Sequence, residues 1–213
     1  MKTDRPPTSS REKPNPSSNP IRCQWPGISA PDYARYHDNE WGVPIYDGAK
    51  LFEKLSLETF QSGLSWLTIL RKREQFRRAF CNFDVREIAQ FCEPDVQRLL
   101  ADPGIIRHRG KIAATINNAR ACIALGGPDA LAKMIWSSVH DAPVVNHFAR
   151  HSDVPSQTAQ STNLAMRLKN AGFKFIGPTT VYALMQSAGL VNDHLVDCHR
   201  HAPCARLQRA GQL

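Results

Sequence analysis

The feature that most constrains the fold is a succession of short segments with helical periodicity, each ended by glycine or proline. In residues 51–60 the large apolar side chains fall on one helical face, and the pattern stops at Ser62-Gly63. Further helices are predicted over residues 65–80, 84–91, 94–100, 110–125, 128–139, 164–171, 178–189 and 192–198, with a long connection over 140–160. No segment alternates apolar and polar residues for long enough to indicate a sheet. The sequence therefore predicts an all-α fold, with two interleaved helical lobes as one possible arrangement.

Length and composition limit the classes of protein that need to be considered. The chain has 213 residues, of which 42% are hydrophobic and 22% charged, as is typical of a soluble globular protein. No stretch approaches the roughly 18 apolar residues of a membrane span, and the first residues contain no apolar run typical of a secretory signal. We therefore expect a cytoplasmic protein whose six cysteines are thiols or metal ligands.

The two ends of the chain differ in composition from its centre. Residues 1–21 consist largely of Pro, Ser, Thr, Asn and charged residues, so we expect a disordered N-terminal tail. The folded domain is expected over residues 22–200, and a flexible C-terminal tail over 201–213.

A basic hairpin points to an acidic macromolecule as partner. The 27 Lys and Arg residues against 19 Asp and Glu residues give a net charge of +8. Gly104 and Gly110 enclose a turn between two helices that carries Arg107, Arg109 and Lys111, a composition suited to gripping a DNA backbone. An ordinary solvated turn is the alternative. The second basic cluster, 71–78, is either a phosphate-facing surface or a solvated helix face.

Histidine and cysteine residues at opposite ends of the domain form a candidate metal site. His194 and Cys198 are four residues apart and would share the face of a helix. Cys23 and His37 offer the other two ligands of a tetrahedral zinc site. From spacing alone, a buried histidine and a buried thiol remain the alternative. The competing ligands are His199, His201 and Cys204.

Aromatic residues are concentrated near the N-terminal end of the domain, and one carboxylate lies in an apolar segment shortly afterwards. The aromatic residues are Trp25, Tyr33, Tyr36 and Trp41. Glu58 lies in the segment that ends at Trp66. Aromatic faces and a carboxylate both attract a flat cationic ring, although each aromatic residue alone could equally belong to the core.

Several motifs together resemble the bacterial DNA-3-methyladenine glycosylase I family. They are YARYHDNEWGVP at 33–44, QSGLSW at 61–66, GIIRHRGK at 104–111, GFKFIG at 172–177 and GLVNDH at 189–194. The resemblance covers about residues 22–200. It departs from the familiar pattern at Thr59-Phe60, where Phe60 would either narrow a pocket or pack in the core.

The resemblance implies a compact helix–hairpin–helix glycosylase fold in which one structural zinc ion ties the N- and C-terminal regions together. The positions that match the family's zinc ligands are Cys23, His37, His194 and Cys198. Those that match its base pocket are Trp25, Tyr33, Tyr36, Trp41, Glu58 and Trp66. Those that match its DNA-binding residues are Gly63 and Leu64, which would fill the gap in the duplex, and Gly104, Arg107, Arg109, Gly110 and Lys111 in the hairpin.

The activity that the resemblance implies is hydrolytic release of 3-methyladenine, and also of 3-methylguanine, from alkylated double-stranded DNA by a monomer. Glu58 is the candidate catalytic residue. Lys111 could in principle form a Schiff base in a lyase step, but the resemblance is to a monofunctional family, and we expect a phosphate contact there. The alternative function is a zinc-stapled DNA-binding or lesion-sensing module without turnover.

Overall fold

The structure is a computed structural model that describes residues 19–210. The tail expected over residues 1–21 therefore lies outside the described residues, except for its last three. The described part of the chain is mostly helical, as the sequence predicts, with one short pair of strands. Its helices are α1 (Pro31–Asn39), α2 (Gly48–Gln61), α3 (Trp66–Ala79), α4 (Val85–Ala89), α5 (Glu93–Ala101), α6 (Arg109–Leu125), α7 (Pro128–Trp136), α8 (Ala159–Asn170), α9 (Pro178–Ser187) and α10 (His201–Ala210).

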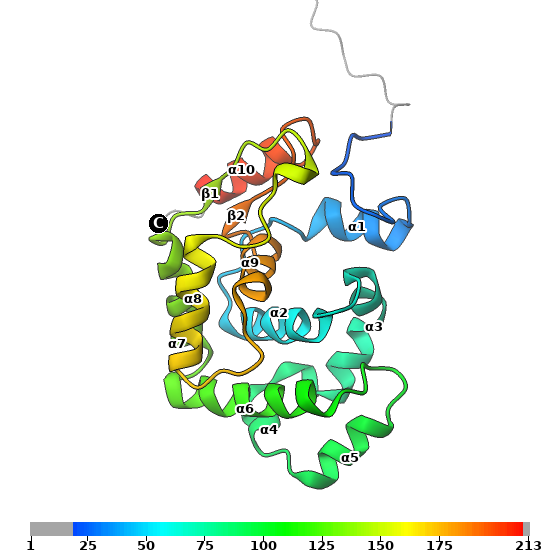
Figure 1. Ribbon diagram of the computed structural model, residues 1–213, viewed down its shortest axis with the longest axis vertical. Coiled ribbons are helices and arrows are strands. Elements are labelled where there is room, and N and C mark those ends of the chain that lie inside the picture. The colour runs from blue at the N-terminus through cyan, green and yellow to red at the C-terminus, as the bar shows by residue number, and fades with distance from the viewer. Residues whose placement is uncertain (1–18, 211–213) are drawn as a thin grey trace, which may run out of the picture.

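Helix α2 occupies the centre of the fold. It packs against α3, α6, α7 and α9, and Figure 1 shows it surrounded by these helices. Residues 51–60 of α2 are almost all buried, which explains the strength of their apolar pattern. Phe60 is fully buried and lies 4.6 Å from Phe76 between ring centroids, so it belongs to the core.

The break between α2 and α3 has a local cause. Gly63 has a φ of +80°, a backbone conformation that strongly favours glycine. Ser65 then accepts a hydrogen bond from the backbone N–H of Thr68 and caps α3, as the sequence predicts. The chain therefore leaves α2 through an exposed turn that contains Ser62, Gly63 and Leu64.

The structure differs from the sequence prediction in the C-terminal quarter. The helix predicted over 192–198 is absent: β2 (Val191–Asn192) pairs in parallel with β1 (Val144–Val145), and turns follow. This pairing joins segments 47 residues apart in the chain (191 minus 144), so no local pattern indicates it. The expectation of a flexible tail over 201–213 is wrong for residues 201–210, which form α10, with Cys204 and Gln208 buried.

The segment that precedes α1 contacts the segment that precedes α10. The backbone N–H of His199 donates a 2.9 Å hydrogen bond to the carbonyl of Ile21. Among the described residues, no helix is both long and apolar enough to cross a membrane.

Candidate functional site

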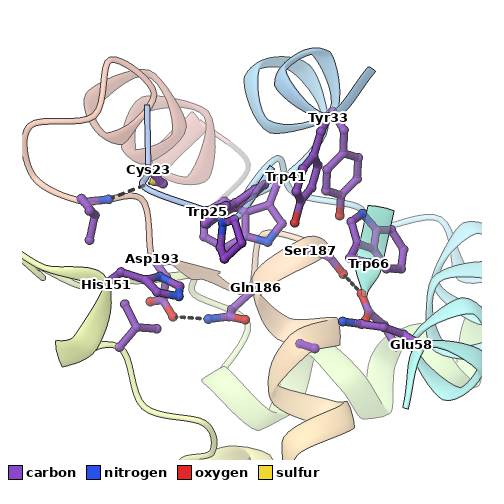
Figure 2. A pocket seen from close by; sticks show the side chains of 16 residues that line it. Cys23, Trp25, Tyr33, Trp41, Glu58, Trp66, His151, Gln186, Ser187 and Asp193 are labelled. Atoms are coloured by element: carbon purple, nitrogen blue, oxygen red, sulfur yellow. Dashed lines mark hydrogen bonds between the residues drawn. The ribbon is translucent and has the colours of Figure 1, made fainter. Parts of the chain in front are cut away.

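A cavity of about 260 Å³ opens between α1, α2 and α9. All six residues predicted for the pocket line it: Trp25, Tyr33, Tyr36, Trp41, Glu58 and Trp66. Figure 2 shows Tyr33, Trp41 and Trp66 on one side, with Glu58 beside Ser187 below them. The fold therefore brings these separate sequence segments together around one space.

The aromatic side chains that line the cavity also pack against one another. The Trp25 and Trp41 rings meet edge to face, with 4.7 Å between their centroids, and the centroids of the Tyr36 and Trp66 rings lie 5.3 Å apart. The indole N–H of Trp66 is buried and has no hydrogen-bond partner among the described residues. A pocket with such a donor in its wall is suited to a ligand that carries an acceptor.

Glu58 is the buried acid of this cavity, with 4% of its surface exposed. Its Oε1 accepts a 2.9 Å hydrogen bond from the Ser187 hydroxyl. Burial raises the pKa of Glu58 to about 7, although the charge of Lys54 and the Ser187 hydrogen bond both act to lower it. A buried carboxyl group whose pKa is raised in this way is typical of a functional site.

The pocket also contains residues that the sequence analysis did not single out for it. Asp193, buried on the opposite side from Glu58, accepts hydrogen bonds from Tyr182 at 2.6 Å, Gln186 at 2.8 Å and Asn146 at 2.7 Å. Asp193 lies within the GLVNDH motif, so that motif was a signal for it. Ser187 carries no such signal, because nothing local relates it to a carboxylate 129 residues away.

A second cluster, next to the aromatic pocket, could hold a metal ion. It consists of Cys23, His37, His194 and Cys198, all buried, with ligand atoms within 4.8 Å of one another. His194 Nδ1 lies 3.5 Å from the sulfur atoms of both cysteines, and His37 Nε2 lies 3.6 Å from that of Cys198. The four predicted ligands therefore meet, although His194 and Cys198 lie on turns and not on a helix.

The surroundings of this cluster orient both imidazole rings toward it. His37 Nδ1 lies 2.8 Å from a carboxylate oxygen of Asp38, and His194 Nε2 lies 3.1 Å from the carbonyl of Trp41. A hydrogen bond from the Cys23 thiol, helped by His194 and His37, holds the pKa of Cys198 well below its usual range. A partner on the far nitrogen of each ring is typical of histidine ligands.

The three competing ligands lie outside this group. His199 faces Asp38 at 2.9 Å, and His201 faces the carbonyl of Asn146 at 2.8 Å. Cys204 is buried, with its sulfur 3.7 Å from a guanidinium nitrogen of Arg200.

Lys111 has surroundings that differ from the expected phosphate contact. Its side chain is buried, and its Nζ donates hydrogen bonds to the carbonyls of Phe60 at 2.8 Å and Ser62 at 2.6 Å. Burial lowers the pKa of its ammonium. Lys111 therefore caps the carboxyl end of α2 and holds the turn that presents Gly63 and Leu64, the latter 42% exposed.

The hairpin 102–110 has the expected glycine geometry. A Cβ at Gly104 would lie 2.1 Å from Cγ of Gln75, so any larger residue there requires the Gln75 side chain to move. Arg107 is exposed, and the first backbone N–H groups of α6, on Arg109 and Gly110, have no acceptor among residues 19–210. The Arg109 side chain pairs with Glu93.

The basic cluster 71–78 is less free than its sequence indicates. Arginines of α3 pair with acids from other segments: Arg71 with Asp32, Arg73 with Glu40 and Arg77 with Glu53. Arg77 also pairs with Glu74 within α3. Less of the positive charge of this cluster is therefore available to contact phosphate than the sequence alone indicates. Asp32, Glu40 and Glu53 come from distant segments, so the local charge run could not indicate them.

The fold and the site together define a helical protein with a cavity lined by aromatic side chains and a buried carboxylate, beside a Cys/His cluster. The family described as methyladenine glycosylase matches residues 25–201. The chain belongs to this family.

Similar proteins of known name support this assignment over most of their length. DNA-3-methyladenine glycosylase 1 of Escherichia coli K12 is 49% identical over 180 residues, which cover 83% of this chain and 95% of that protein. DNA-3-methyladenine glycosylase of Haemophilus influenzae is 46% identical over 184 residues, covering 86% and 97%.

Solved structures support the same family assignment. A crystal structure of 3-methyladenine DNA glycosylase I has a TM-score of 0.82 at 49% identity and covers 85% of this chain and 100% of its own. The Staphylococcus aureus enzyme, in a study of 3-methyladenine recognition, has a TM-score of 0.77 at 39% identity, covering 82% and 94%.

Proposed function

We propose that this chain is a base excision repair glycosylase that flips alkylated adenine out of double-stranded DNA and releases it as 3-methyladenine. The observation that carries the proposal is the convergence of Glu58 with five aromatic residues around one cavity. Family membership and the named relatives support the same activity. Release of 3-methylguanine is part of the proposal.

Recognition depends on the charge of the damaged base. Methylation at N3 makes the adenine of the nucleotide cationic, and aromatic faces attract a cation that has lost its water. We assign stacking to Tyr36, Trp41 and Trp66. Glu58, as a carboxylate facing the N6/N7 edge of the base, is assigned to accept a hydrogen bond from the N6 amino group. Unmodified adenine has no positive charge and is held less well.

The reaction needs little acid catalysis, because the cationic base is already a good leaving group. The bond between the base and C1′ breaks, its electrons pass to the base, and the sugar becomes an oxocarbenium-like cation. Water adds to C1′ and loses a proton, which leaves free base and an abasic site. Glu58 also stabilises the positive charge electrostatically, and no lyase step follows.

We assign the contacts with DNA to two exposed turns. Leu64, on the turn held by Lys111, fills the gap left by the flipped base. The hairpin 102–110, a helix–hairpin–helix element, binds backbone phosphate through the free N–H groups of Arg109 and Gly110 and through Arg107. A Schiff base on Lys111 is disfavoured, because its ammonium faces two carbonyls.

We assign the Cys/His cluster to one structural zinc ion. Zn–N bonds of about 2.0–2.1 Å and Zn–S bonds of about 2.3 Å in a tetrahedron separate N and S ligands by about 3.5 Å. The sulfur–nitrogen distances of 3.5 and 3.6 Å agree with this spacing. Four protein ligands close the site, so the metal would join the two ends of the domain and take no part in the chemistry.

Two further assignments complete the proposal. We propose that the active species is a monomer, with all residues assigned to the pocket in one chain. We also propose a cytoplasmic location, since the named relatives are bacterial and chromosomal DNA would be the substrate.

The test is chromatographic measurement of bases released from methylated DNA. The wild-type protein should release 3-methyladenine above a control without enzyme. A folded, metal-containing protein that binds DNA but releases no base would instead support the alternative, a DNA-binding or lesion-sensing module.

A further inference from the structure

We propose that Lys54 is a positioning residue of the base pocket: it is the buried counter-charge that keeps Glu58 in its carboxylate form. The inference rests on the proposed role of Glu58 in base recognition. It concerns a lysine to which neither the sequence motifs nor the reaction gives a role.

The position of Lys54 in the fold is unusual for a lysine. It lies on α2, four residues before Glu58 and so one helical turn away on the same face. Only 8% of its surface is exposed. A lysine is almost never buried without a partner, because removing its charge from water is costly.

The aromatic walls of the pocket account for part of this burial. The Lys54 Nζ lies 4.9 Å from the centroid of the Tyr36 ring and 5.7 Å from that of Trp66. It donates a hydrogen bond of 3.5 Å, at the outer limit of such bonds, to the Tyr36 hydroxyl. The ammonium is thus held by ring faces and by one weak hydrogen bond.

Lys54 lies behind the pocket and does not line it. It borders a second cavity, of about 250 Å³, which shares Trp66 with the base pocket. A base stacked against Trp66 would therefore have Glu58 in the pocket with it and Lys54 beyond the wall. Lys54 would not touch the base, so its effect on the reaction passes through Glu58.

The other acidic side chains near Lys54 already have arginine partners. Around Lys54, Glu40 pairs with Arg73, and Glu53 pairs with Arg77. From α9, Glu58 meets the uncharged Ser187, and from α1 it faces Tyr33 and Tyr36. Burial, together with the charge of Glu58, raises the pKa of both tyrosines, so they stay neutral. Lys54 is the cation whose charge opposes the effect of burial on Glu58.

The consequence for function lies in the charge state of Glu58. Burial alone favours the protonated, neutral form of Glu58. That form has no charge to attract a cationic base. With Lys54 in place, the carboxylate persists at a lower pH than burial alone would allow, and the pocket stays selective for the cation.

The experiment compares the pH dependence of base release in single-turnover assays for three variants. Lys54→Met should move the acid limb upward by about one pH unit or more, with activity recovered at higher pH. Lys54→Arg, which keeps the charge, should stay close to wild type. Lys50→Met removes the same charge from an exposed position one turn earlier on α2 and serves as the matched control.

Two results would overturn the proposal. One is a folded Lys54→Met protein whose pH profile superimposes on that of wild type. The other is an activity loss that is equal at every pH, which indicates a purely structural role. Carboxyl ¹³C NMR titration of Glu58 supplies a readout without catalysis: the midpoint should rise in Lys54→Met and not in Lys50→Met. If wild type releases no base, the proposed function fails, while this titration still decides the role of Lys54.

Discussion

The hydroxyl of Ser187 on α9 donates a 2.9 Å hydrogen bond to Oε1 of Glu58 on α2. Both residues are buried, and the bond joins the two helices at the floor of the base pocket. A hydroxyl donor favours the ionised carboxyl group, so Ser187 supports the charge state on which recognition of a cationic base depends.

Removal of this donor should weaken the enzyme at low pH. A hydrogen bond to a charged group contributes about 1.5–3 kcal/mol, so we expect Ser187→Ala to lower base release roughly 10-fold on the acid side of neutrality. The loss should shrink as pH rises and Glu58 ionises without help. Single-turnover release across pH measures the effect.

A second buried serine on α2 provides the control for this experiment. The Ser56 hydroxyl bonds the carbonyl of Phe52 and does not face the pocket. Ser56→Ala should leave the shape of the pH profile unchanged. Equal profiles for the two alanine variants would contradict the assigned role of Ser187.

Glu58 should also affect stability, with a defined sign. Its pKa rises from 4.5 in the unfolded chain to about 7 in the folded protein. The unfolded chain therefore releases its proton first, and the stabilising contribution is complete below about pH 4.5 and is lost as pH rises through about 7. At 1.36 kcal/mol per pKa unit the loss is on the order of 3 kcal/mol.

Comparison with Glu58→Gln isolates this effect, because glutamine does not titrate and the other groups are common to both proteins. The Tm of wild type relative to Glu58→Gln should fall between pH 5 and pH 7 and then level off. A difference in Tm that stays constant, or that grows with pH, would contradict a raised pKa for Glu58.

Loss of one ligand should open the metal cluster. We expect Cys198→Ser to lose about one equivalent of zinc, since the proposed site of four ligands would hold a single ion. A cost of a few kcal/mol corresponds to a Tm lower by about 5 °C or more for a chain of this size. Metal analysis and thermal unfolding measure the two effects.

Cys204→Ser is the matched control, because Cys204 is equally buried but lies outside the cluster. It should keep the metal. Retention of zinc by Cys198→Ser, with loss in Cys204→Ser, would mean that the ligand set is wrong.

Lys111 and Arg107 lie close together in sequence, and we expect opposite signatures from their removal. Lys111→Met leaves the carbonyls of Phe60 and Ser62 without their donor, at a cost of about 1–3 kcal/mol in stability. It should reduce base release and leave the salt dependence of DNA binding unchanged. Arg107→Ala should leave stability unchanged and lower the salt slope by about 1, as expected for one phosphate contact. A lower salt slope for Lys111→Met would restore the phosphate contact predicted from sequence.

The sequence predicted what short-range patterns encode. The periodicity of residues 51–60 located α2, because its buried face recurs at helical spacing. The six pocket residues and four cluster residues were named from the family resemblance, and the fold brings each set together.

Long-range contacts account for what the sequence could not predict. The segment 192–198 was predicted to be a helix, yet Asn192 pairs with Val145 of β1, and His194 and Cys198 meet Cys23 and His37 from turns. Arg73 and Arg77 appeared free because Glu40 and Glu53 lie on other segments. Lys54 is the instructive case: a lysine one turn before Glu58 on an apolar helix was a local signal for a buried positive charge near the carboxylate.

The central claim is that Glu58, as a carboxylate within the aromatic pocket, selects the cationic base. Its most direct test is the single-turnover rate of 3-methyladenine release from methylated DNA by wild type and by Glu58→Gln at a pH above 7. We predict that wild type releases the base and that the variant, still folded, is slower by roughly 10- to 100-fold, the equivalent of one hydrogen bond to a charged group. Full-rate release by Glu58→Gln would contradict the claim.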